Sequence, residues 1–156
     1  MTNYARRESA PQSNTFHFAI FDHVEELDLV GPWELVGLLA DRKLCPPPQL
    51  VTLDTKVPVG EHGMRFQADL HFIDAPATDV LFVPGGSGAR AVMNDPVVLS
   101  YLRAHAATGR PVLSVCTGSY LMQAAGLFAG RRATTHWAFL SHLKTDPAIE
   151  VVEERM

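Results

Sequence analysis

The sequence predicts an α/β domain whose mostly parallel sheet is covered by helices on both faces. Continuously apolar runs, such as residues 80–83, are typical of strands that are buried on both sides. Segments with the apolar spacing of amphipathic helices alternate with these runs. This alternation indicates βαβ units, in which successive strands run parallel.

Apolar runs rich in β-branched and aromatic residues predict four strands, at residues 16–21, 50–53, 80–83 and 112–115. Three helices are expected to begin near Pro32, Pro96 and Thr117. Proline is favoured at the first helical position because it has no N–H that needs a partner there. Asp95 is the expected cap of the second helix, and Gly109 is expected to end it.

Composition excludes several classes of protein. The 156 residues carry 13 basic and 17 acidic side chains without a basic run, which argues against a nucleic-acid partner. No apolar stretch approaches the ~18 residues of a membrane span. The two cysteines form no disulfide framework, and the histidines lack metal-ligand spacing. We expect a disordered tail over residues 1–14, then one reduced, soluble, cytoplasmic domain over residues 15–156.

Cys116 is the sharpest candidate for chemistry. The segment Ser114-Val115-Cys116-Thr117-Gly118 places the thiol between a strand and a helix, as in a nucleophile elbow. Unpaired N–H groups at a helix N-terminus favour the thiolate, so the pKa of Cys116 is expected below the usual ~8.5. A buried, inert thiol is the alternative, and we adopt it for Cys45 in its proline-rich loop.

Three further features follow predicted strands, and the carboxyl ends of parallel strands meet at one edge of a sheet. N–H groups of the Gly85-Gly86-Ser87-Gly88 loop could stabilise negative charge, although a simple tight turn explains the loop equally well. Asp28 is either a helix cap or a general acid and base with a raised pKa. His136 is either the base of a Cys–His pair or a polar residue at a strand end.

Four segments of the chain resemble the ThiJ/PfpI superfamily, with its class I glutamine amidotransferase-like fold: residues 27–32, 83–88, 114–119 and 125–137. The resemblance implies a flavodoxin-like three-layer sandwich. Within the superfamily the chain is most similar to isonitrile (isocyanide) hydratases and to ligand-sensing domains of AraC-type transcription regulators. A glyoxalase or chaperone activity is a weaker alternative because that branch has glutamate where Asp28 stands. Thr117 replaces the histidine of the peptidase-like branch.

The resemblance also implies a mechanism. Cys116 attacks an isonitrile carbon to form a thioimidate, and Asp28 shuttles a proton between water and this intermediate. Gly86 and Thr117 orient the substrate through backbone N–H groups, whereas His136 matches a family position without having to touch the sulfur. No cofactor or metal is required, the substrate is a small molecule, and a homodimer is implied. Family members continue beyond this point with a further strand and helix, so the resemblance implies a truncated domain.

Overall fold

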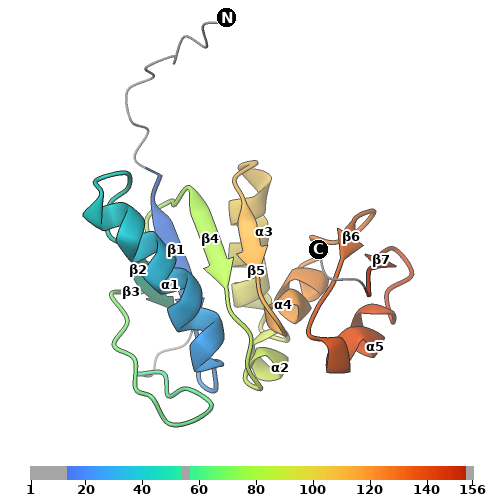
Figure 1. The fold of residues 1–156 in the computed structure, drawn as a ribbon. Helices are drawn as coiled ribbons and strands as arrows, with labels where there is room; N and C mark the ends of the chain where they lie inside the picture. Colours follow the sequence, from blue (N-terminus) through green and yellow to red (C-terminus); the bar gives the residue numbers. More distant parts are fainter. Residues whose placement is uncertain (1–13, 54–56, 154–156) are drawn as a thin grey trace, which may run out of the picture.

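The computed structural model describes residues 14–53 and 57–153, and its centre is a five-stranded parallel sheet in the order β3-β2-β1-β4-β5 (Figure 1). The central strand β1 contains Ala19 and Ile20, which are fully buried because both faces of the sheet are covered. The strands are β1 (Phe16–Ile20), β2 (Gln49–Thr52), β3 (Leu70–His71), β4 (Val80–Val83) and β5 (Val112–Ser114).

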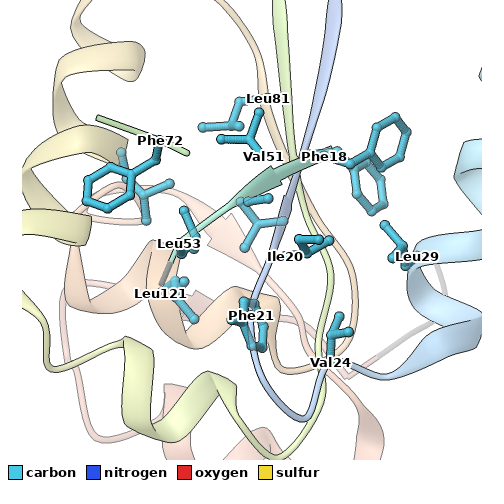
Figure 2. Packing of buried hydrophobic residues seen from close by; sticks show 14 of the residues in the cluster. Phe18, Ile20, Phe21, Val24, Leu29, Val51, Leu53, Phe72, Leu81 and Leu121 are labelled. Atoms are coloured by element: carbon cyan, nitrogen blue, oxygen red, sulfur yellow. The ribbon is translucent and has the colours of Figure 1, made fainter. Parts of the chain in front are cut away.

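Helices lie on both faces of this sheet, which gives three layers. Helix α1 (Glu26–Asp41) covers one face, while α3 (Pro96–Ala107) and α4 (Gly118–Ala124) cover the other (Figure 2). Phe18 packs edge-on against Trp33 of α1, with ring centroids 5.4 Å apart. On the opposite face Phe72 contacts Tyr101 of α3 at 5.5 Å. The predicted α/β fold class is therefore confirmed.

Local signals placed α3 correctly. Asp95 accepts hydrogen bonds from the backbone N–H groups of Val97 and Val98, at 2.8 and 3.3 Å. Gly109 follows the end of the helix with a φ of +77°, a conformation that glycine adopts without a steric cost. Both the predicted cap and the predicted end of the helix are confirmed.

The predicted start of the first helix is wrong. α1 begins at Glu26, so Pro32 lies inside the helix instead of at its first position. Pro32 cannot donate to the carbonyl of Asp28, which therefore lacks its ordinary helical partner. Asp28 belongs to the first helical turn, and the cap position is held by Glu25, whose side chain makes no capping hydrogen bond. Asp28 is thus not the helix cap that the sequence allowed.

The C-terminal part of the described chain forms a small unit beside α4 (Figure 1). It contains a parallel pair of short strands, and its own apolar cluster includes Tyr120 of α4 together with Leu143 and Ile149. Its elements are β6 (Arg132–Ala133), the 3-10 helix η1 (Trp137–Phe139), α5 (Leu140–Leu143) and β7 (Glu150–Val151). The short helix α2 (Ala89–Val92) also contacts α4.

Two expectations concern properties outside the packed core. The predicted tail lies outside the described residues except for residue 14. Within residues 14–53 and 57–153, every helix is too short or too polar to cross a membrane.

Candidate active site

Cys116 lies on a sharp turn between β5 and α4. Its φ of +52° is a left-handed conformation that non-glycine residues rarely adopt, and such strain is typical of nucleophile elbows. Gly118 makes the turn possible, since a Cβ there would lie 2.3 Å from the carbonyl oxygen of Val83. The structure thus places the half-buried thiol where the sequence predicts it, at the carboxyl edge of the sheet.

The carboxyl group of Asp28 lies beside the side chain of Cys116, because a Cβ on Gly85 would approach both of them within 2.8 Å. The Oδ2 atom of Asp28 accepts a hydrogen bond from the backbone N–H of Gly85, at 3.2 Å. A Cβ on Gly85 would lie 2.7 Å from Asp28 Oδ2 and 2.8 Å from Cys116 Cβ. Only glycine therefore allows the loop, the acid and the thiol to meet at this point.

Burial raises the pKa of both partners in this pair. For Asp28 desolvation is the dominant cause, as the sequence allowed for a general acid. For Cys116 desolvation is again the largest cause, and the charge of Asp28 adds to it. The expected lowering of the Cys116 pKa is therefore wrong, because a nearby carboxylate and partial burial outweigh the backbone N–H groups. The Asp28 carboxylate raises the pKa of Cys116, whereas hydrogen bonding to Cys116 lowers that of Asp28, so the two groups titrate as a coupled pair.

The glycine-rich loop is fixed to the elbow by a reciprocal contact. The Gly86 N–H donates to Thr117 Oγ1, and that hydroxyl donates to the Gly86 carbonyl oxygen, both at 2.9 Å. Gly86 has a φ of +125°, and a Cβ there would lie 2.1 Å from the His23 carbonyl oxygen. The Gly86 N–H is thus engaged by Thr117, and its role in orienting substrate stays a prediction. Hydrogen bonding from the backbone N–H of Thr117 lowers the pKa of Cys116, against the effect of burial.

A pocket of about 370 Å³ opens above the Asp28–Cys116 pair. Ser87 at its wall donates from both its N–H and its hydroxyl to Glu61 Oε2, at 3.1 and 2.8 Å. Its further lining combines carboxylates, one arginine, apolar side chains and His136: Glu25, Leu27, Gly86, Arg90, Thr117, His136 and Phe139. This volume is large enough to hold a small-molecule ligand.

His136 lines this pocket without contacting the sulfur. Its Nδ1 atom accepts a hydrogen bond from the Ala138 N–H at 3.3 Å and so caps the 3-10 helix. Within the described residues Cys116 takes Asp28 as its acidic or basic partner, and a Cys–His pair is not formed. His136 lies three residues after β6 ends at Ala133 and caps η1, so it matches neither the base of a Cys–His pair nor a residue at a strand end. Its charge still lowers the pKa of Asp28 slightly, against the effect of burial.

Sequence reasoning missed Arg90. Its guanidinium lies 4.8 Å from the ring centroid of Phe139 and 5.8 Å from that of Tyr120. The contact joins α2 to the C-terminal unit, and no local spacing in the sequence marks it. Cys45, in contrast, is buried as expected, with its Sγ 3.8 Å from the Val36 carbonyl oxygen.

Glu26, at the start of α1, is fixed by contacts with the loop over residues 60–64. Its carboxylate accepts hydrogen bonds from the His62 and Met64 N–H groups, at 2.7 and 3.4 Å. Desolvation raises the pKa of Glu26, but these bonds and the His62 side chain together lower it to about 2. Ligand atoms of Glu25, Glu26 and His62 lie within 4.8 Å of one another, the spacing of a candidate cation site. The Glu26 carboxylate is already occupied by these hydrogen bonds.

Fold and site together define a class: a parallel α/β domain with a cysteine on a nucleophile elbow and a carboxyl partner from the first helix. The chain belongs to the DJ-1/PfpI family, whose profile matches residues 15–156.

Two relatives and one solved structure describe its place in the family. It is 41% identical over 134 residues to isonitrile hydratase of Pseudomonas putida, covering 86% of this chain and 57% of that protein. It is 32% identical to the HTH-type transcriptional regulator GbdR of Pseudomonas aeruginosa, covering 92% of this chain and 40% of the regulator. A ThiJ/PfpI family protein from Pseudomonas syringae superposes with a TM-score of 0.78 at 26% identity, over 99% of this chain and 64% of that one. The family thus includes enzymes and regulators.

Proposed function

We propose that this chain carries the active site of an isonitrile hydratase-like enzyme, which adds water to an isonitrile to give an N-substituted formamide. The observation that carries the proposal is the position of the Asp28 carboxyl beside Cys116 on its elbow. Such a pair supplies a nucleophile and a proton carrier at the same point. The likeness to isonitrile hydratase of Pseudomonas putida supports the choice of substrate class.

In the first step a carbon–sulfur bond forms. The sulfur of Cys116 donates an electron pair to the terminal carbon of the isonitrile, and the Asp28 carboxyl delivers a proton to the same carbon. The product is a thioimidate in which the former isonitrile carbon bears hydrogen, sulfur and a double bond to nitrogen. The raised pKa of Asp28 suits this step, because the carboxyl group must hold a proton before the attack.

In the second step water reaches the same carbon. The Asp28 carboxylate takes a proton from the water as the water oxygen adds to the thioimidate carbon, and it passes this proton to the nitrogen. The hydroxyl on the tetrahedral carbon then gives its proton to Asp28 as the carbon–sulfur bond breaks. The N-substituted formamide leaves, and its departure restores one proton to the Asp28–Cys116 pair. One water is consumed and the Asp28–Cys116 pair returns to its starting state. The Thr117 N–H at the sulfur stabilises the anion as it leaves.

A second candidate is a ligand-sensing domain of a transcription regulator. The similarity to GbdR covers 92% of this chain, including the segment with Cys116. In such a role the same pocket of about 370 Å³ binds a small molecule without turnover. The two functions differ in whether the bound ligand is consumed.

Turnover of a simple isonitrile separates them. Purified protein is incubated with benzyl isonitrile, and the formamide is followed by proton NMR. The expected result is formamide from the wild type and none from Cys116→Ala, with Cys45→Ala retaining full turnover as the matched control. Full turnover in Cys116→Ala would overturn the mechanism. A wild type that binds the compound but produces no formamide would favour the sensor.

A further inference from the structure

The carbonyl oxygen of Cys116 is held by two hydroxyl groups on the side away from the thiol. Ser119 Oγ and Thr135 Oγ1 each lie 2.9 Å from this oxygen, and the Ser119 N–H donates to it at 3.3 Å. The two hydroxyl oxygens lie 2.8 Å from each other. Ser119 is fully buried in α4, and Thr135 follows β6, so two separate parts of the chain converge on one peptide group.

The number of hydroxyl protons limits which hydrogen bonds this cluster can form at the same time. Each hydroxyl has a single proton to donate, and three oxygen–oxygen contacts share the two protons. One arrangement has Thr135 donating to the Cys116 carbonyl while Ser119 donates to Thr135. Exchanging these roles leaves the carbonyl with a hydroxyl donor in either case. The two hydroxyls of this clamp, Ser119 and Thr135, therefore orient each other through their 2.8 Å contact, so removing either one loosens the hold on the carbonyl oxygen.

Fixing this oxygen also fixes the N–H at the other end of the same peptide. In a trans peptide the C=O and N–H bonds lie in one plane and point in opposite directions. The nitrogen is that of Thr117, and a Cβ built on Gly85 would lie 2.7 Å from it. The same Cβ would lie 2.7 Å from Asp28 Oδ2 and 2.8 Å from Cys116 Cβ. The Thr117 N–H thus lies on the reactive side of the elbow, opposite the clamped carbonyl.

We propose that Ser119 and Thr135 are positioning residues that hold the peptide between Cys116 and Thr117 in the orientation that directs its N–H at the sulfur. The proposal rests on the proposed function only in taking Cys116 as the reacting group. Neither hydroxyl touches the pocket; both act through the peptide plane.

The strained backbone of Cys116 explains why such a clamp is needed. A left-handed φ is sterically disfavoured at a non-glycine residue, so the surrounding structure must favour it. Without the hydroxyl donors, the carbonyl and N–H of this peptide can rotate towards a less strained arrangement. The N–H then leaves the sulfur, and the thiolate loses a hydrogen bond. Through Thr135, the C-terminal unit is coupled directly to the reactivity of the thiol.

Alkylation of Cys116 by iodoacetamide tests this directly because the thiolate is the reacting form. The rate is measured against pH in the full chain, and peptide mass spectrometry counts Cys116 separately from Cys45. Thr135→Val keeps the shape of the side chain and removes its hydroxyl. We expect its midpoint to rise by about one pH unit, which slows alkylation roughly tenfold at a fixed pH below the midpoint. Thr135→Ser, which keeps the hydroxyl, is expected to retain the wild-type profile.

A matched control separates positioning from general destabilisation. Thr78 is fully buried, and its hydroxyl donates to the Thr15 carbonyl oxygen at 2.9 Å, remote from the elbow. Thr78→Val is expected to leave the alkylation profile unchanged, and Ser119→Ala to shift it in the same direction as Thr135→Val. Thermal unfolding verifies that each variant is folded.

Two outcomes would overturn the clamp: a wild-type profile for Thr135→Val, or an equal shift in Thr135→Val and Thr135→Ser. Iodoacetamide needs no isonitrile chemistry, so these results stand even where the proposed hydration fails. A protein that never consumes an isonitrile but shows the Thr135→Val shift rejects the proposed function and keeps the clamp.

Discussion

The carboxyl group of Asp28 lies beside the thiol of Cys116, and the pKa of each lies above its ordinary value. Asp28 comes from the first turn of α1 and Cys116 from the end of β5. The first turn of α1 and the β5–α4 elbow therefore bring an acid and a nucleophile together. The Asp28 carboxylate disfavours the Cys116 thiolate, so changing the acid alters the chemistry of the thiol in a predictable direction.

Asp28→Asn is expected to separate thiol reactivity from turnover. Removing the carboxylate removes a cause that raises the pKa of Cys116, so iodoacetamide alkylation at neutral pH becomes faster. Each unit by which this pKa falls accelerates alkylation about tenfold below the midpoint. Isonitrile hydration, in contrast, is expected to fall about a hundredfold or more, because the proton carrier is lost. Asp79→Asn, at a surface site, serves as the control, and a parallel fall in both rates would contradict this account.

The stability of the protein should report the same pair. An acid whose pKa is raised on folding favours the folded state most at pH values below its unfolded pKa. This contribution is lost as the pH rises through the folded pKa. Asparagine does not titrate, so Asp28→Asn does not lose this stability as the pH rises. The melting temperature of the variant, measured relative to that of the wild type, is therefore expected to be higher at pH 8 than at pH 4. Differential scanning calorimetry at the two pH values measures this difference, and a constant offset would argue against the raised pKa.

Elements with strong local signals could be predicted from the sequence. The strand at Val80–Val83 and the helix begun by Asp95 and Pro96 depend on apolar runs and caps that neighbouring residues provide. The start of α1 depends instead on a tertiary contact, since Glu26 binds the loop at His62 and Met64. A proline inside the helix then gave a misleading local signal.

The candidate site shows the same division. The meeting of Asp28 with Cys116 follows from strands that end at one edge of a parallel sheet, so the sequence could suggest it. The hydrogen bond from the Gly86 N–H to Thr117 Oγ1 depends on the positive φ of Gly86, which no sequence motif specifies. The direction of the Cys116 pKa was predicted wrongly because the helix terminus was weighed without the neighbouring carboxylate.

Gly85→Ala tests the close approach of the loop to the reactive pair. The added Cβ would lie 2.7 Å from Asp28 Oδ2 and 2.8 Å from Cys116 Cβ, so it must push the acid and the thiol apart. We expect turnover to fall by about a hundredfold or more, comparable to losing the acid itself. Gly37→Ala is the matched control, since a Cβ on this helical glycine meets nothing within 4 Å. That control should gain about 0.5–1 kcal/mol of stability from its helix propensity. Equal activity in the two variants would contradict the packing argument.

Glu26→Gln tests the attachment of the loop over residues 60–64 to the first turn of α1. The pKa of Glu26 is lowered to about 2, so its contribution to stability is present above its unfolded pKa and is lost as the pH falls towards 2. Hydrogen bonding to Glu26 raises the pKa of His62, so the contribution of the histidine is present below its unfolded pKa and is lost as the pH rises through the folded value. The pair therefore stabilises the fold most between about pH 4.5 and 6.5.

We expect the melting temperature of Glu26→Gln to lie furthest below that of the wild type in this range, and the two melting temperatures to converge near pH 2. Glu150→Gln, which removes an exposed ion pair with Arg132, is the control and should change the melting temperature little at any pH. A deficit of Glu26→Gln that is the same at pH 2 and pH 6 would show that the carboxylate's charge does not hold this loop.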